Sequence, residues 1–193
     1  MAEERLSPEH AEHLAELELS YPEEMQMGLE VIRQKLETLE RSGYSFSWIL
    51  FERERPTAFL IAYPATSHLD VPEPDPVIYI GEMIVERNRP HDFYRLLSLM
   101  VDDLEERNLA HLAIEAVCRR GVYDVVKEHP RVIARLGYEL SGQYEYWDDK
   151  IGEEVCWMRW VPLRAPEVIA QESFSFSEDL LEELSWFESR LGH

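Results

Sequence analysis

Two glutamates stand in stretches that are otherwise apolar, and their setting suits proton transfer. Glu82 lies within VIYIGEMIV at residues 77–85, and Glu115 lies within the strand-like run at residues 112–117. Burial disfavours the charged form of a carboxyl group, so its pKa rises toward values useful to a general base. For Glu82 the alternative is a solvent-facing position or an ion pair with an arginine. Glu115 could share a proton with Glu82 or bind a cationic amine, and its alternative is a structural salt bridge.

Other side chains offer less chemistry. Cys118 and Cys156 are the only cysteines, and each lies in a strand-like stretch where a buried free thiol is expected. Nucleophilic catalysis by either would need a histidine partner that the sequence does not place. His10 and His13 stand three apart on a predicted helix, but no further ligand is spaced to join them, so we expect no metal site.

The elements that must position these glutamates follow from the hydrophobic periodicity. Two helices are expected within residues 9–41, with a break at Tyr21-Pro22, and two more over 93–107 and 122–136. Strands are expected over 44–51, 57–63, 77–85, 112–117, 143–147 and 154–160. Residues 64–76 contain four prolines and are expected to form a loop. Gly81 inside its strand indicates a bulge or a close approach by another backbone, and Asp92 is expected to cap the helix after it.

This order predicts the α/β class in its mixed α+β form, with a central mixed sheet flanked by helices. One βαβ crossover lies at the centre and antiparallel hairpins lie at the ends. Residues 1–163 are expected to form one domain, and 164–193 a linker and an acidic amphipathic helix. The apolar stripe of that helix is regular enough to dock on the domain or on a second subunit, so a homodimer is one interpretation.

Charge limits the partners. The chain has 193 residues, with 19 Lys and Arg against 39 Asp and Glu, a formal net charge of −20. Such a field repels nucleic acid and anionic lipid and attracts small cationic amines or basic proteins, although solubility alone would also explain it. No apolar run approaches the roughly 18 residues of a membrane span, and the first residues do not resemble a signal peptide. We therefore expect no nucleic-acid partner, no membrane insertion and a cytoplasmic location.

Three local strings, taken in order, resemble the GNAT acyltransferase superfamily. LAELELSYPE at residues 14–23 is similar to the first helix of that family and the Ser-aromatic-Pro that ends it. GEMIV at residues 81–85 is similar to its central strand, and RLGYE at residues 135–139 to the Leu-Gly-Phe-Glu before its last hairpin. The resemblance covers roughly residues 5–163.

The resemblance implies an acetyl-CoA-dependent N-acyltransferase acting on a small-molecule or protein amine. In that family acyl-CoA lies where the central strand parts from its neighbour, which here implies contact with the backbone of Met83, Ile84 and Val85. Glu82 would be the general base, with Glu115 beside it. The diphosphate would lie at residues 88–95, at the start of the next helix.

Several residues depart from the pattern of the family. The glycines of the phosphate loop fall on Arg95 and Leu97, and there is no glycine between Gly81 and Gly121. The arginine side chains at positions 87, 89 and 95 (Arg87, Arg89 and Arg95) would then bind the phosphates, or would only form salt bridges. The tyrosine that protonates the leaving thiolate in the family is replaced by Ile133. These departures leave a catalytically inactive GNAT-like binding module as the alternative, and an acidic protein that occupies a basic surface as a third reading.

Overall fold

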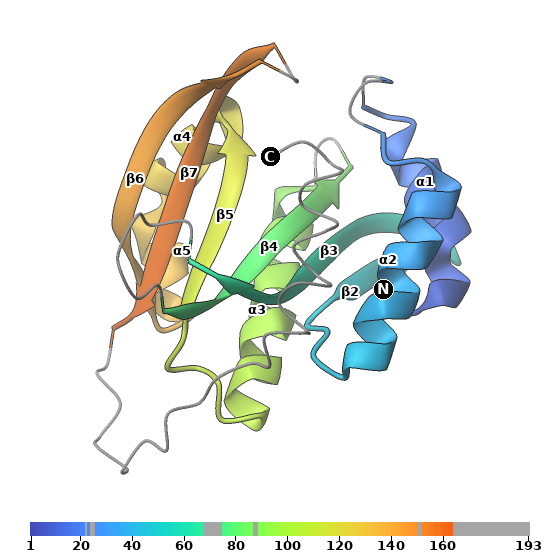
Figure 1. Ribbon diagram of the computed structural model, residues 1–193, viewed down its shortest axis with the longest axis horizontal. Helices are drawn as coiled ribbons and strands as arrows, with labels where there is room; N and C mark the ends of the chain where they lie inside the picture. Colours follow the sequence, from blue (N-terminus) through green and yellow to red (C-terminus); the bar gives the residue numbers. More distant parts are fainter. Residues whose placement is uncertain (22, 24–25, 68–74, 87–88, 150–151, 164–193) are drawn as a thin grey trace.

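The computed structural model describes residues 1–21, 23, 26–67, 75–86, 89–149 and 152–163, and its centre is one seven-stranded mixed sheet (Figure 1). The strands are β1 (Ala2–Arg5), β2 (Trp48–Glu52), β3 (Arg55–Thr66), β4 (Pro76–Val85), β5 (Ala113–Arg119), β6 (Tyr138–Asp148) and β7 (Glu153–Pro162). The helices are η1 (Pro8–His10), α1 (Ala11–Glu18), α2 (Leu29–Ser42), α3 (Pro90–Glu106), α4 (Arg120–Glu128) and α5 (Pro130–Arg135). The spatial order of the strands in the sheet is β1-β2-β3-β4-β5-β7-β6, and only the β4–β5 pair is parallel.

Helices cover both faces of the sheet, and each face has its own apolar core. Leu14 of α1 and Ile32 and Leu36 of α2 pack on one face with inward residues of β3 and β4. Helices α3, α4 and α5 pack on the opposite face, where Met100 of α3 and Tyr123 of α4 belong to the second core. Alternate residues of β3 and β4 therefore enter different cores, and strand register decides which core a side chain joins.

The expected class and element order are confirmed, including the hairpins and the βαβ crossover. The prediction of a continuous loop over residues 64–76 is wrong at both ends, because Pro64 pairs with Ile78 and Pro76 with Thr66. Strand β2 pairs with β3 only as far as Leu60, so Pro64 has a partner strand on one side and its missing N–H is tolerated. Strand β1 was not expected, because its four exposed residues carry no apolar pattern.

Helix α3 begins earlier than its apolar stripe predicts. Arg89 is the N-cap residue and Pro90 opens the helix, so Asp92 lies inside the first turn and is not the cap. The C-terminal helix expected within 164–193 lies outside the described residues. None of the helices in the described ranges is long and apolar enough to cross a membrane.

Candidate active site where two parallel strands part

The two central parallel strands pair over only part of their length. The paired register runs from Val77 with Ala113 to Ile80 with Ala116. Beyond it, residues 81–85 of β4 remain paired with β3, and residues 117–119 of β5 with β7. Figure 1 shows β4 and β5 diverging toward their carboxyl ends. Within the described chain, the β5-facing edge of Met83, Ile84 and Val85 therefore has no partner strand.

A bulge in β4 sets the direction of Glu82. Ile61 of β3 pairs with Glu82 and Ala62 with Ile80, so Gly81 is the extra residue. Before the bulge Tyr79 belongs to the core under α1 and α2, and after it Ile84 belongs to the same core. The extra residue shifts the alternation by one position and so directs Glu82 toward α1 and α2. The bulge expected at Gly81 is confirmed.

A tyrosine ring explains why the bulge residue is glycine. A Cβ atom at position 81 would lie 2.7 Å from both Cε1 and Oη of Tyr63. Tyr63 is fully buried and packs edge-on against Tyr79, with 5.9 Å between the ring centres. The close approach comes from this side chain and not from another backbone.

Glu82 meets a second buried carboxyl group, Glu18, whose role is not predicted from the sequence. Glu18 is the last residue of α1 and is 2% exposed. Its Oε2 accepts a hydrogen bond from the Met27 N–H at 3.0 Å. Glu18 Oε1 and Glu82 Oε2 are both buried, and neither has a hydrogen-bond donor within the part of the chain that the structure describes. The two carboxyl groups interact with each other, and such a contact requires a proton between them.

Burial dominates the electrostatics of this pair. Desolvation raises the pKa of Glu82 well above the ordinary value, and the charge of Glu18 raises it further. Desolvation also raises the pKa of Glu18, against the effect of its hydrogen bonds. Lys35 of α2 is 1% exposed, and its positive charge lowers both pKa values. The Lys35 Nζ lies 5.4 Å from the centre of the Tyr63 ring.

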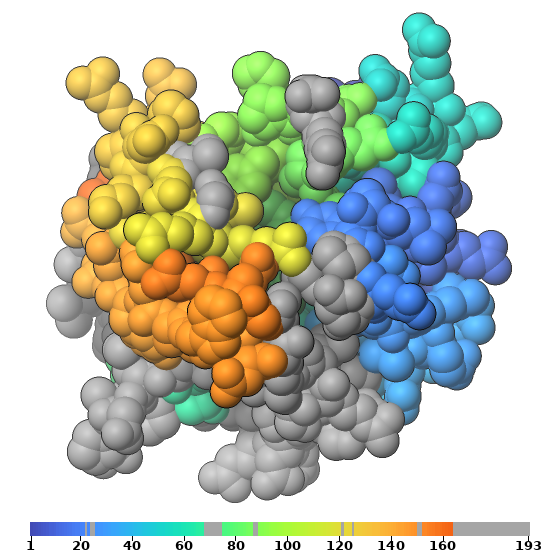
Figure 2. Space-filling view, turned by 90° about the horizontal axis from the view of Figure 1, so that it is seen from above, coloured from blue at the N-terminus to red at the C-terminus, as the bar shows by residue number. Residues whose placement is uncertain are grey.

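An aromatic and charged contact spans the same end of the sheet. The Arg119 guanidinium at the end of β5 lies 5.8 Å from the ring centre of Tyr21, which follows α1. Arg119 also forms an ion pair with Glu153 of β7. Burial raises the pKa of Tyr21, and the negative charge of Glu82 raises it further. Figure 2 looks onto this end and shows the yellow region around the end of β5 reaching the blue N-terminal helices.

Glu115 forms a structural salt bridge with Arg159, the alternative to a catalytic role that its sequence context left open. It is 0% exposed, and its Oε1 accepts hydrogen bonds from Ser67 Oγ and Arg159 Nη1, both at 2.6 Å. In the sheet it stands opposite Tyr79, in the paired part of β4 and β5, so the structure does not bring it to Glu82. The ion pair links β5 to its neighbour β7.

The arginines proposed for phosphate contact hold carboxylates instead. Arg89 donates from Nε to Asp92 at 2.6 Å and from Nη1 to Glu52 at 2.7 Å. Asp92 is buried in the first turn of α3, where it also accepts a hydrogen bond from Thr57 Oγ1. Arg95 binds both carboxylate oxygens of Glu3 through Nε and Nη2, at 2.5 and 2.6 Å. Arg87 lies outside the described residues.

Other sources of acid or nucleophile are engaged or buried. The Tyr123 hydroxyl donates to Gln143, and the Tyr138 hydroxyl donates to the Ala110 carbonyl. Cys118 stands opposite Cys156 in the β5–β7 pair, and burial raises the pKa of its thiol to about 12, so it is protonated at neutral pH. Across the described ranges, no group of three or more His, Cys, Asp or Glu side chains is placed to hold a metal ion.

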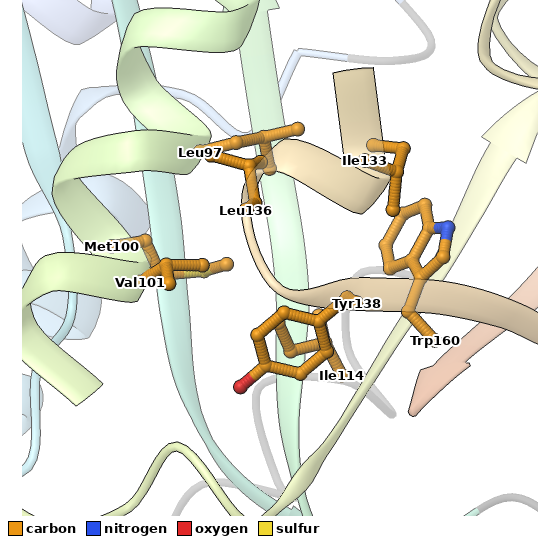
Figure 3. A pocket seen from close by; sticks show the side chains of 8 residues that line it. All are labelled: Leu97, Met100, Val101, Ile114, Ile133, Leu136, Tyr138 and Trp160. Carbon is orange, nitrogen blue, oxygen red and sulfur yellow. The ribbon is translucent and has the colours of Figure 1, made fainter. Parts of the chain in front are cut away.

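An apolar pocket lies on the opposite face of the sheet, between α3 and α5 (Figure 3). It is lined by Leu97, Met100, Val101, Ile114, Ile133, Leu136, Tyr138 and Trp160. Ile133 faces this pocket. Its packing there explains why an apolar residue stands where the GNAT family has a tyrosine. None of these eight lining residues is charged, so we assign the pocket to the core and not to the candidate site.

No family model matches the sequence, and no curated protein matches it either. Solved structures do match. The ribosomal-protein-S18-alanine N-acetyltransferase from Escherichia coli is 15% identical with a TM-score of 0.57, over 91% of this chain and 99% of that one. A putative acetyltransferase from Salmonella typhimurium, solved with its cofactor acetyl-CoA, is 14% identical with a TM-score of 0.60, over 90% and 98%.

A eukaryotic protein matches in the same way. Naa20 from Chaetomium thermophilum, in complex with a bisubstrate analogue, is 12% identical with a TM-score of 0.60, over 91% of this chain and 92% of that one. The folds agree over nearly the whole length of both chains. The sequence identities are too low to indicate a substrate. Together with the parted strands and the bulged central strand, it shows that this chain has the GNAT N-acetyltransferase fold.

Proposed function

We propose that this protein is an acyl-CoA-dependent N-acyltransferase that transfers an acetyl group to an amine, with Glu82 as the general base. One observation carries the proposal: a buried carboxyl group lies on the strand whose edge is left open where β4 and β5 part. Structures of this fold include an agmatine N-acetyltransferase and the alanine N-acetyltransferase named above, so small-molecule and protein amines are both candidate acceptors.

The open strand edge fits the amide-bearing arm of an acyl-CoA. Backbone groups of Met83, Ile84 and Val85 on the β5 side could pair with that arm as another strand would. Acetyl-CoA would supply an activated acyl thioester at this edge. Glu82 would accept the proton that the attacking nitrogen loses, directly or through water.

The region where the diphosphate was expected, at the start of α3, supports the alternative function, a catalytically inactive GNAT-like binding module. The first turn of α3 contains a buried carboxylate, Asp92, and no glycine. Arg89 and Arg95 would have to leave Asp92, Glu52 and Glu3 before they could bind a diphosphate. The arginines in this arrangement do not fit the phosphates, so we assign no phosphate contact to them.

Calorimetric titration with acetyl-CoA, and then with free CoA, separates the two functions. Micromolar binding supports the acyltransferase, and no heat from well-folded protein would overturn it in favour of the binding module. Arg89→Met and Arg95→Met test whether these arginines turn toward the phosphates on binding. Arg55→Met, which removes another arginine–glutamate pair at the β2–β3 turn, is the matched control.

The role of Glu82 is tested with a panel of amines and acetyl-CoA. Glu82→Gln should lower kcat by roughly 10²–10⁴-fold, the usual contribution of a general base. Glu16→Gln, an exposed glutamate on α1, should leave kcat unchanged. Glu115→Gln tests the second predicted catalytic residue. We expect it to weaken folding through the loss of the Arg159 pair, with kcat of the folded fraction retained.

The outer strand β6 supports the proposal of a homodimer. It forms one edge of the sheet, and Leu140, Tyr144 and Trp147 on it are exposed to 37%, 47% and 62%. Light scattering on a dimer would give twice the chain mass of 22.8 kDa. Trp147→Asp should then shift the protein toward the monomer, whereas a monomeric wild type would refute the dimer.

A further inference from the structure

The carboxyl pair of Glu18 and Glu82 is assembled from distant segments. Glu18 ends α1, and Glu82 follows the bulge of β4, which directs it to the face that α1 covers. The Met27 N–H holds one oxygen of Glu18, which fixes the orientation of its carboxyl group. The other oxygen of Glu18 and Oε2 of Glu82 are buried, and neither has a donor in the described ranges.

The positive charge around the pair does not balance two ionised carboxylates. Lys35 from α2 interacts with both carboxyl groups, and Tyr21 from the segment after α1 interacts with Glu82. The Tyr63 ring lies under Lys35, and Arg119 of β5 and Glu153 of β7 lie beyond Tyr21. Arg119 and Glu153 neutralise each other. Lys35 balances one carboxylate, so the second must hold a proton or meet another cation.

We propose that Glu18 and Glu82 act as one unit that binds the ammonium group of the acceptor, and that the acceptor is a primary aliphatic amine. An ammonium group donates three hydrogen bonds, and each carboxyl group has a buried oxygen whose only partner in the described chain is the other carboxyl group. The Tyr21 ring, which already accepts the Arg119 cation, supplies an aromatic wall of the kind that cations favour. The proposal rests on the proposed acyl transfer and names its acceptor class.

The same pair would also receive the proton. The ammonium displaces the shared proton on binding, and later gives one of its own protons to the pair to become a neutral amine. Its lone pair then forms the N–C bond with the acyl carbon, and the C–S bond breaks with its electrons on sulfur. The remaining excess proton on nitrogen passes to the thiolate, which leaves an amide and free CoA.

Calorimetry with n-butylamine tests the binding step without turnover. Titration in two buffers of different ionisation enthalpy measures the protons released, and we expect about one proton per amine bound near neutral pH. Glu18→Gln should weaken binding about 10–100-fold, as the loss of a charge-assisted hydrogen bond does, and should abolish the proton release. n-Butanol, which has no charge, should give no proton release.

Two variants keep the result interpretable. A glutamine at position 18 retains an oxygen for the Met27 N–H, so far-UV circular dichroism should show an intact fold. Glu16→Gln removes the same charge from an exposed position of the same helix and should bind n-butylamine as the wild type does.

The outcomes separate this proposal from the proposed function. If acetyl-CoA is bound and amines are acetylated but Glu18→Gln matches the wild type in affinity and proton release, the paired site is wrong and acyl transfer stands. If n-butylamine binds with proton release but acetyl-CoA does not bind, the cation site stands and acyl transfer fails. If folded protein binds n-butylamine without proton release, or not at all, the pair is not the amine site.

Discussion

At the scale of single residues, Gly81 and Tyr63 decide where the candidate base lies. The bulge at Gly81 turns Glu82 toward Glu18, and the Tyr63 ring occupies the volume that a side chain at position 81 would need. A glycine thus has a double role here, in backbone register and in packing.

Gly81→Ala should destabilise the protein by about 1–3 kcal/mol, the usual effect of forcing extra volume into a packed core. The new Cβ would lie 2.7 Å from two atoms of the buried Tyr63 ring, which has little room to move. Urea unfolding measures the change. Tyr63→Phe in the same chain should recover part of the loss, because it removes the Oη contact. An unchanged midpoint in the single variant would contradict the packing.

The raised pKa of Glu82 predicts how stability depends on pH. Burial raises this pKa well above 4.5 in the folded protein, so the folded state binds more protons than the unfolded state between the two values. The free energy of unfolding should therefore fall as the pH rises from about 4.5 through the raised pKa.

The Glu82→Gln variant tests this slope. An amide does not titrate, so we expect a weaker fall in the free energy of unfolding over the same window. Urea unfolding at a series of pH values measures it, with Glu139→Gln on the exposed face of β6 as the control. Equal slopes in wild type and Glu82→Gln would show that Glu82 is not titrating as a buried group.

At the scale of elements, the first turn of α3 explains why this chain lacks the glycines of the GNAT phosphate loop. Asp92 places a carboxylate where the helix N-terminus favours negative charge, and Arg89 and Thr57 bind it. Glycines at a helix start let the backbone N–H groups approach a bound phosphate closely. Here the buried carboxylate of Asp92 already supplies the negative charge, so glycines are not required. The missing glycines and the Asp92 contacts are thus two aspects of one local structure.

Asp92→Asn should destabilise the fold by about 1–3 kcal/mol, because it removes charge from hydrogen bonds to Arg89 and from the helix N-terminus. Thermal unfolding measures the effect, and Asp102→Asn, an exposed position of the same helix, is the matched control. Equal melting temperatures for Asp92→Asn and the control would mean that Asp92 contributes nothing to this helix start.

At the scale of the whole molecule, the net charge of −20 surrounds a site that we propose to bind a cation. A field of this sign raises the local concentration of small cations, and salt screens it over about 30 Å at 0.01 M and about 10 Å at 0.1 M. The same excess of acids supplies the carboxylates that hold Arg89 and Arg95. Global charge thus favours the proposed acceptor and disfavours the phosphates of the donor.

Ionic strength should therefore affect acceptor and donor in opposite directions. Raising the salt from 0.01 to 0.3 M should weaken n-butylamine binding several-fold, roughly as the screening length shortens. Binding of the polyanion acetyl-CoA should weaken less, or strengthen. Calorimetry at four salt concentrations gives both slopes. Equal slopes for the cation and the anion would show that the global field has no part in recognition.

The order and type of the elements could be predicted from the sequence, because local periodicity and turn residues carry that information. The nearly continuous apolar run of β4 and the stripes of α2 and α3 were sufficient to place Glu82 on a buried strand of a mixed sheet. Strand β1, the end of β3 and the start of α3 were missed, since edge strands, prolines and first turns take their structure from neighbours and not from an apolar pattern.

Which carboxyl groups meet could not be predicted from the sequence, because it depends on the packing of distant segments. Glu82 and Glu115 share the same kind of sequence context, yet Arg159 pairs with one and Glu18 faces the other. Glu18 follows Ala11 by seven residues and Leu14 by four, which places it on the apolar stripe of its helix, but this spacing does not show which group it meets. Long-range packing, and a one-residue shift of register at Gly81, bring residues 18, 35 and 82 together. A local sequence pattern does not predict such a contact, because the energy of the contact depends on partners that are distant in the chain.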